Sequence, residues 1–330
     1  MDLTFLICSE RSGSNLITRM LDAHPEVCGP PPTHAVRTFA LNILRYGDLT
    51  REENWIDLTE DLADLLKNQL GAWRTSTRGE EIRREATERS LAAALRVPYE
   101  REAAAHGKQA LFIKENQTER LLPYILTAFP TSKFVYLVRD PRDMALSWKL
   151  SSNHPGRVAR GAETWKRNQE RGIACYGFLK PTGRIHLLRY EDLIEDPERE
   201  MIRICRFLDL PYSAEMLSFH VQGSTRANAS RLRDWENLAR PVMSGNSNKY
   251  RAALSRPEIE FVEALFREEM VFLSYPLEFE PGDLERAREA LEKLDAGAGE
   301  SAAKVDGGEI EIRERRLQVL RRILSRPAQP

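Results

Sequence analysis

Short apolar runs without polar alternation recur along the chain, and segments with helical spacing lie between them. The runs are "LTFLIC" (3–8), "ALFIK" (110–114), "KFVYLV" (133–138) and "IHLLRY" (185–190). Continuous apolar runs of this length are typical of strands that are buried on both faces of a sheet. Because helical segments separate them, the sequence predicts an α/β fold with a central parallel sheet. Right-handed crossovers would place the loops after these strands at one edge, where open sheets bind ligands.

Two regions depart from this alternation. At 51–108 the spacing of apolar residues is helical and the charge density is high, which predicts a helical insertion. This insertion could cover a binding site as a lid, or it could form an ordinary solvated layer on one face of the sheet. The pattern leaves both interpretations open.

The second region is the C-terminal tail, 281–330. It reads as a charged helix, then a flexible linker, "DAGAGESAAKVDGGE", and a last helix, "IEIRERRLQVLRRIL". The last helix carries a stripe of apolar residues among arginines. We therefore predict that it docks on a partner or forms a homo-oligomer, and that the catalytic domain is confined to 1–280.

Composition narrows the class of protein. Of 330 residues, 42% are hydrophobic and 30% are charged, as in a soluble globular protein. The net charge of −1 gives no overall field for nucleic acid or an anionic membrane, so an anion site would have to be built locally. The four cysteines lack metal-ligand spacing, and we expect no metal site. No apolar run could span a bilayer, and the first strand leaves no room for a signal peptide, so we expect a cytoplasmic protein.

The stretch "FLICSERSGSNLITRML" has the layout of a strand, a phosphate-binding loop and a helix. Gly13 permits a tight turn, and Ser12, Ser14 and Asn15 offer polar groups at the start of the helix. Arg11 adds a cation that can bind a phosphate with two hydrogen bonds. The Lys–Ser or Lys–Thr pair that closes a nucleotide P-loop is missing. The loop therefore predicts an anion site of another kind.

A second cluster follows the strand at 133–138, in "KFVYLVRDPRDMALSWKL". Arg139 stands at the end of the strand, Asp140 can cap the next helix, and Pro141 suits its first position. Ser147 lies two turns into that helix, on a face that can turn toward Arg139. Arginine and serine so placed suit a second phosphate group. A capped helix with surface arginines is the alternative.

Together, the two clusters make the sequence resemble the PAPS-dependent sulfotransferase family, where PAPS is 3′-phosphoadenosine 5′-phosphosulfate. In that family the first loop holds the 5′-phosphosulfate, and an arginine followed eight residues later by a serine holds the 3′-phosphate. Arg139 and Ser147 meet this spacing. The first loop looks most like the carbohydrate, tyrosylprotein and bacterial lipopolysaccharide-type branches, which carry arginine where cytosolic enzymes carry lysine. The resemblance implies a three-layer, P-loop-like fold over 1–280.

Other segments are similar to the same family. In "LRYEDLIEDPEREMIRICRFLDLPY", Tyr190 matches a tyrosine near the adenosine. In "SGNSNKYRAALSRPEIEFVEALFREEM", Lys249 and Arg251 fall where basic residues complete the 3′-phosphate site. Stacking on the adenine calls for an aromatic ring, and Trp148, Tyr190 and Tyr250 are the candidates. The insertion and the tail lie outside the resemblance.

Transfer of a sulfonate requires stabilisation of the leaving phosphate and removal of a proton from the acceptor. Arg11 can serve the leaving phosphate, and Lys114 resembles the family lysine that approaches the bridging oxygen. Cytosolic members carry a histidine two residues after that lysine, where this chain has Asn116. We predict His34, in "CGPPPTHAVRTF", as the general base, with Glu115 as the second choice.

The sequence thus predicts a PAPS-dependent sulfotransferase that acts on a hydroxyl of a carbohydrate, a lipid-linked acceptor or a small molecule. A P-loop kinase is the first alternative, although the loop lacks its lysine and no acidic magnesium ligand follows the expected strand. A non-catalytic nucleotide-binding or scaffold protein that uses the tail helix for partners is the second.

Overall fold

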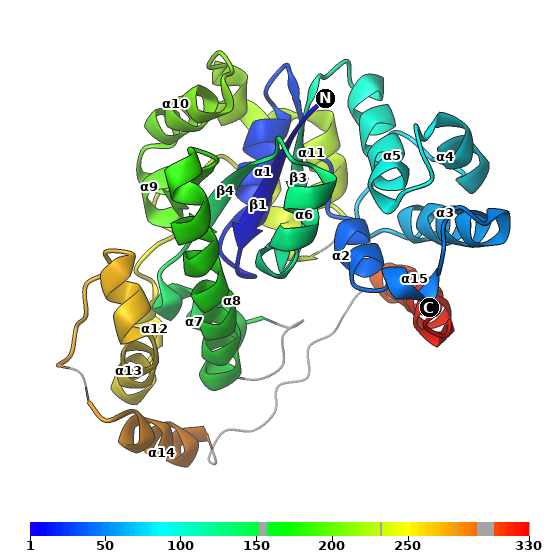
Figure 1. Ribbon diagram of the computed structural model, residues 1–330. Helices are drawn as coiled ribbons and strands as arrows, with labels where there is room; N and C mark the ends of the chain where they lie inside the picture. The colour runs from blue at the N-terminus through cyan, green and yellow to red at the C-terminus, as the bar shows by residue number, and fades with distance from the viewer. Residues whose placement is uncertain (152–156, 232, 281, 296–306, 330) are drawn as a thin grey trace.

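A parallel sheet forms the centre of the computed structural model, which describes residues 1–151, 157–231, 233–280, 282–295 and 307–329. Its strand order is β2–β3–β1–β4–β5 (Figure 1). The bounds are β1 (Asp2–Cys8), β2 (Val27–Cys28), β3 (Ala110–Lys114), β4 (Lys133–Val138) and β5 (Ile185–Arg189). The strands predicted from the apolar runs are confirmed, whereas β2 is too short to leave a pattern.

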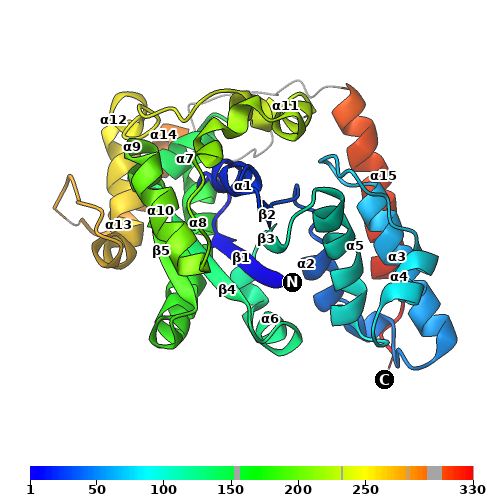
Figure 2. The same ribbon diagram turned by 90° about the horizontal axis from the view of Figure 1, so that it is seen from above.

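Side chains of β1 alternate between two hydrophobic cores, one on each face of the sheet. Leu6 and Cys8 pack with α1 (Ser14–Asp22), α9 (Tyr190–Glu195) and α10 (Pro197–Leu208). Phe5 and Ile7 belong to the core shared with α5 (Leu91–Ala105), α6 (Leu122–Ala128) and α8 (Arg157–Leu179). This alternation follows from the two-residue period of a strand. The result is the expected three-layer α/β fold (Figures 1 and 2).

Further helices surround these layers. Those on the side of β4 and β5 are α7 (Pro141–Lys149), α12 (Tyr250–Ala253), α13 (Arg256–Phe272) and α14 (Leu284–Asp295). Shorter pieces are α2 (Ala35–Ala40), α11 (Gly223–Ala229), η1 (Ile43–Arg45), η2 (Thr118–Arg120), η3 (Lys180–Thr182), η4 (Ala214–Val221) and η5 (Arg233–Ala239). Of the helices in the described ranges, none combines the length and the apolar composition that spanning a bilayer requires.

The start of α7 is capped as predicted. The Asp140 side chain accepts a hydrogen bond from the backbone N–H of Arg142, and Pro141 takes the first helical position. Arg142 is also fully buried and pairs with both Asp140 and Glu263. This buried network fixes the corner between β4 and α7, and with it the position of Arg139.

The segment 51–108 forms α3 (Glu52–Lys67), α4 (Gly79–Glu85) and α5. α5 packs against β2 and β3, and α3 and α4 pack on each other farther out (Figure 2). Leu70 is the residue of this segment that reaches the pocket described below. These contacts favour the interpretation of the segment as a helical layer, in which α5 lies on the sheet and α3 and α4 lie outside α5.

The last helix, α15 (Gly307–Ser325), lies beside α3 in both views (Figures 1 and 2). One face of α15 is covered by its own chain, because Val319 and Ile323 are buried in the main core, whereas Ile310, Leu317 and Leu324 are exposed. Arg322 pairs with Asp61 and Asp64 of α3 at 2.8 and 2.7 Å. The docking element predicted from the sequence therefore docks within the chain, and a homo-oligomer through α15 stays a prediction. Most of the predicted flexible linker, 296–306, lies outside the described residues.

Candidate active site

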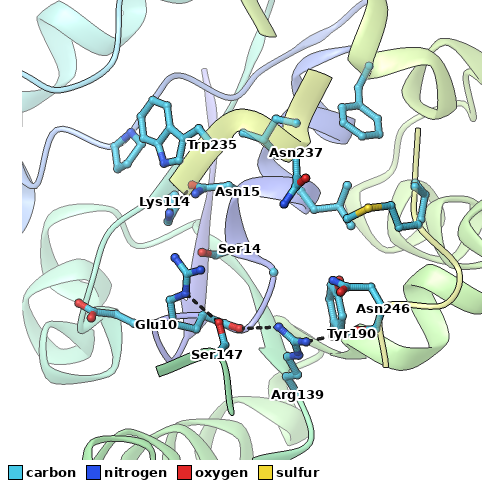
Figure 3. Close-up of a pocket in the computed structure, with 18 of the residues that line it drawn as sticks. Glu10, Ser14, Asn15, Lys114, Arg139, Ser147, Tyr190, Trp235, Asn237 and Asn246 are labelled. Atoms are coloured by element: carbon cyan, nitrogen blue, oxygen red, sulfur yellow. Dashed lines mark hydrogen bonds between the residues drawn. The ribbon is translucent and has the colours of Figure 1, made fainter. Parts of the chain in front are cut away.

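A pocket of about 400 Å³ lies at the carboxyl edge of the sheet (Figure 3). β1 runs between β3 and β4, so the loop after β1 has a neighbouring strand end on each side. The structure brings together here many of the residues that the sequence indicated: Arg11, Gly13, Ser14, Asn15, His34, Lys114, Arg139, Ser147 and Tyr190. These residues lie far apart in the chain, and the parallel arrangement of the strands is what makes them neighbours.

The N-terminus of α1 opens into this pocket. Gly13 has φ 91°, and a Cβ on it would lie 2.3 Å from Cδ2 of Tyr190, so only glycine fits. The first turn of α1 has no acidic residue and no side-chain cap. Ser14 and Asn15 line the pocket, and amides at the start of a helix have no partner within the helix. Such a helix start favours an anion.

Arg11, Ser147 and Arg139 form a connected group. Nε of Arg11 donates a hydrogen bond to Oγ of Ser147 at 3.0 Å, and Nη1 of Arg139 donates to the carbonyl oxygen of Arg11 at 3.0 Å. The Arg139 guanidinium also stacks on the Tyr190 ring, 4.5 Å from its centroid, and donates to the carbonyl oxygen of Asn246. The two predicted anion-binding clusters are thus joined by direct contacts.

A second pocket of about 320 Å³ adjoins the first and shares these three side chains with it. Lys249 lines this second pocket. The carboxylate of Asp143 accepts hydrogen bonds from the backbone N–H groups of Asn248 and Tyr250, at 2.6 and 3.0 Å, and so holds the Lys249 loop against α7. In Figure 3, Lys114 and Asn15 lie on one side of Ser14, and Ser147 and Arg139 lie on the other. The arrangement offers two basic subsites about one loop.

Lys114 ends β3 and is buried, with 8% of its surface exposed. Its ammonium group donates a hydrogen bond to Oδ1 of Asn15. Burial, helped by the positive charges of Arg19 and Arg11, lowers the pKa of Lys114 to about 8, although Cys8 and Glu10 oppose the shift. The charged form of Lys114 is unfavourable in this buried position, so an anion that binds beside the ammonium group stabilises it strongly.

His34 lines the pocket, and Glu115 lies behind it. Nδ1 of His34 is 3.8 Å from Oε2 of Glu115, whose side chain is fully buried and absent from the pocket wall. Burial lowers the pKa of His34 below its usual 6.5, although Glu115 opposes this. The imidazole is therefore neutral at neutral pH, and the nitrogen turned away from Glu115 is the one available to a ligand. Asn116 instead donates to Glu10 at 2.8 Å.

Three predicted binding residues face away from both pockets. Ser12 is fully buried. Tyr250 is also fully buried, because its ring packs on the guanidinium of Arg142 at 4.3 Å and its hydroxyl donates to Glu278 at 2.7 Å. Arg251 is exposed and pairs with Glu278 at 2.9 Å. The turn after Lys249 thus places Tyr250 and Arg251 outside both pockets, and their contact with a ligand stays a prediction.

Of the three aromatic candidates for stacking, Tyr190 alone lines the pocket, since Trp148 packs against Gly161 of α8. One wall of the pocket consists of residues that the sequence analysis did not name, except for the segment in which Asn246 lies. Its residues share an irregular stretch of 3₁₀ turns and loops without a regular period: Phe219, Trp235, Asn237, Leu238, Arg240, Pro241, Val242, Met243 and Asn246. Trp235, in the polar run "RDWENLAR", was the one available signal. Arg313 of α15 also lines the pocket, although the sequence placed the tail outside the catalytic domain.

The family described as "Sulfotransferase family" matches residues 4–214, which include the first loop, Lys114, Arg139, Ser147 and Tyr190. The chain belongs to the sulfotransferase family. A candidate protein-tyrosine sulfotransferase of Caenorhabditis briggsae is 30% identical over 216 residues, 64% of this chain and 66% of that protein. Protein-tyrosine sulfotransferase of Drosophila melanogaster is 28% identical over 66% of this chain and 40% of its own length. This sulfotransferase-family chain thus spans two thirds or less of the length of these curated relatives.

Solved structures show the same fold. The sulfotransferase domain from the curacin biosynthetic pathway has a TM-score of 0.57 at 21% identity, covering 84% of this chain and 98% of that one. The sulfotransferase domain of the Synechococcus PCC 7002 olefin synthase has a TM-score of 0.53 at 17% identity, covering 90% and 95%. At these identities the likeness concerns the fold alone, and it agrees with the three-layer α/β fold described above.

Proposed function

We propose that this chain is a PAPS-dependent sulfotransferase that moves a sulfonate group to a hydroxyl. The observation that carries the proposal is the pair of adjoining basic pockets joined by the Arg11–Ser147 hydrogen bond. A donor with a 5′-phosphosulfate and a separate 3′-phosphate needs two anion sites a few ångströms apart. A nucleoside triphosphate, with its phosphates in one row, needs only one.

The residues present fit this donor. The open amides of α1, together with Arg11 and Lys114, suit the 5′-phosphosulfate. Arg139, Ser147 and Lys249 suit the 3′-phosphate. The buried Nε of Arg139 has no hydrogen-bond partner among the residues that the structure describes. This N–H group therefore remains to donate a hydrogen bond to a ligand, and the resemblance to the family assigns Arg139 to the 3′-phosphate.

The chemistry follows from these positions. The bond from sulfur to the bridging phosphate oxygen breaks as the acceptor oxygen bonds to sulfur, and the negative charge grows on the 5′-phosphate. Lys114 and the α1 amides stabilise that charge. The acceptor's proton passes to the ring nitrogen of His34 that faces the pocket, while Glu115 stabilises the resulting imidazolium at Nδ1. His34 is thus our choice of base, and Glu115 supports it from behind.

For the acceptor, we propose the phenolic hydroxyl of a tyrosine in a peptide as the first to test. The curated relatives named above are protein-tyrosine sulfotransferases. Apolar residues gather on one wall of the pocket, where Leu70 packs with Trp235 and Leu238. Trp235 lies on the Lys114 side (Figure 3), where an aromatic acceptor ring would have to sit. Hydroxyls of carbohydrates, lipid-linked acceptors or small molecules, which the first loop's resemblance implied, come second.

The kinase alternative is weakened by the corner after β4. A magnesium ligand would be sought at this strand end, but both oxygens of Asp140 are engaged by Arg142, at 3.0 and 2.7 Å. Arg139 there is a cation, which suits an anion and not a metal ion.

Calorimetry with adenosine 3′,5′-bisphosphate and with ADP tests the proposal. We expect the bisphosphate to bind at least tenfold more tightly, and we expect Arg139→Ala and the smaller change Ser147→Ala to remove that preference. Equal or tighter binding of ADP would overturn the proposal in favour of a kinase. Radiolabelled PAPS with a tyrosine-containing peptide tests turnover. If His34→Ala binds the bisphosphate but transfers no sulfonate, the non-catalytic scaffold alternative is excluded.

A further inference from the structure

Arg316 of α15 is a charged residue inside the protein, and it lies outside the residues that match the family. Only 9% of its surface is exposed, and burial lowers its pKa to about 10. Its guanidinium donates to three backbone carbonyl oxygens: those of Thr33, of Leu65 at 3.4 Å and of Asn68 at 3.5 Å. Burying a guanidinium against uncharged carbonyls is unfavourable, and the negative charge of Glu115 offsets only part of that cost.

The carbonyl of Thr33 belongs to the peptide group that precedes His34. His34 has φ 57°, in the left-handed region that residues with a Cβ seldom adopt. Rotation about this φ moves the imidazole relative to the Thr33 carbonyl. A hydrogen bond from Arg316 that fixes this carbonyl therefore restrains the direction of the His34 side chain.

A second path connects the same loop to Glu115. Oγ1 of Thr33 lies 2.9 Å from the hydroxyl of Tyr99, and that hydroxyl donates to Oε1 of Glu115 at 3.4 Å. The other oxygen of Glu115 faces Nδ1 of His34. Thr33 is thus held at its carbonyl by α15 and at its hydroxyl by α5, and the loop and the carboxylate behind His34 form one connected unit.

The charges around His34 come from three elements. Glu115, after β3, favours the protonated imidazole, whereas Arg37 on α2 and Arg316 on α15 disfavour it. Tyr99 of α5 reaches His34 indirectly, through Glu115 and through Thr33. Arg316 therefore acts on His34 in two ways, through the backbone and through its charge.

We propose that Arg316 is a positioning residue for the His34 base, so that the C-terminal helix is part of the catalytic apparatus. This inference rests on the proposed function in one respect, the role of His34 as the base. The effect of α15 on the geometry and the protonation of His34 can be measured without any acceptor.

The test compares Arg316→Gln and Arg316→Lys with Arg322→Gln as the matched control. Arg322 lies on the same helix and pairs with Asp61 and Asp64, so its loss removes a charge and an ion pair of α15 while Val319 and Ile323 still hold the helix in the core. The imidazole pKa of His34 is followed by NMR of histidine-labelled protein, with the signal assigned from His34→Gln. Bisphosphate affinity and the rate of proteolysis in the tail report whether each variant is folded and docked.

We expect Arg316→Gln to raise the His34 pKa, because a positive charge is lost, and to lower kcat for a tyrosine-containing peptide by ten- to a hundredfold at unchanged bisphosphate affinity. Arg316→Lys should keep the pKa near that of the wild type and still lose kcat, since a single ammonium nitrogen cannot replace both Nη1, which bonds to Leu65 and Asn68, and Nη2, which bonds to Thr33. Arg322→Gln should change neither the pKa of His34 nor kcat. An unchanged pKa in Arg316→Gln, or equal shifts in Arg316→Gln and Arg322→Gln, would overturn the inference. If Arg316→Gln does not fold, kcat of Arg316→Lys decides, and a wild-type value overturns the proposal. Failure of wild type to bind the bisphosphate would instead overturn the proposed function.

Discussion

Replacing Lys114 by methionine should stabilise the ligand-free protein while it abolishes sulfonate transfer. Burial lowers the pKa of Lys114 from 10.5 to about 8, and each unit corresponds to about 1.4 kcal/mol, so the buried ammonium destabilises the fold by about 3 kcal/mol near neutral pH. Methionine has a similar length and no charge, but it loses the hydrogen bond to Asn15, which contributes about 1 kcal/mol. The net gain is about 2 kcal/mol.

Urea unfolding of wild type and Lys114→Met at several pH values measures this gain. In the folded wild type Lys114 loses its proton near pH 8, whereas in the unfolded chain it keeps the proton up to about pH 10.5. The unfolded state therefore binds more protons between these values, and wild-type stability rises with pH there relative to the variant. We expect the gap to be largest at pH 7 and to narrow toward pH 10.

The control is Lys67→Met at the exposed C-terminus of α3, which should change stability by less than about 0.5 kcal/mol at every pH. A Lys114→Met variant that is less stable than wild type at pH 7, or a gap that does not depend on pH, would show that the buried ammonium does not destabilise the fold. Bisphosphate affinity should fall in the same variant, because a cation at the leaving phosphate is lost.

Three further predictions concern the loop after β1, the base His34 and the corner between β4 and α7. Gly13→Ala should weaken bisphosphate binding at least tenfold in calorimetry, because the new Cβ would lie 2.3 Å from Tyr190; Gly183→Ala has a similar positive φ and open space around it, and should leave binding unchanged. The transfer rate should hold down to pH 6.5, because the lowered pKa of His34 keeps its imidazole neutral there, and should fall at lower pH as the ring gains a proton; a fall that already begins above pH 6.5 would contradict His34 as the base. Arg142→Ala should lower the free energy of unfolding by about 3–5 kcal/mol in urea, since two buried carboxylates lose their partner; a loss below about 1 kcal/mol would contradict this.

The sheet and the centre of the site could be predicted because both depend on short-range pattern. Buried parallel strands leave continuous apolar runs, and the residues that follow them meet at one edge of the sheet. These two patterns are sufficient to predict that Arg11, Lys114 and Arg139 share one pocket. The capping of α7 by Asp140 was likewise readable, because an N-cap acts within a few residues.

The rest of the site depends on contacts that no local pattern records. Trp235 and Asn246 stand on 3₁₀ turns and loops, where side chains have no regular period. Lys249 and Tyr250 are neighbours in the chain, yet one lines a pocket and the other enters the core, because the turn there is held by Asp143. The docking of α15 joins segments more than two hundred residues apart, which sequence spacing alone cannot anticipate.

The position of β1 in the sheet has a consequence for the order of folding. β1 is the first strand in the chain and the middle strand of the sheet, and its partners are β3, which starts at Ala110, and β4, which ends at Val138. The loop that carries Arg11 and Gly13 joins β1 to α1, and its contacts with Arg139 and Tyr190 can form only after those later segments have been made. Such long-range pairing is slow. During synthesis, β1 therefore stays unpaired until β3 and β4 have been made. We expect donor binding only in chains that extend well past Val138.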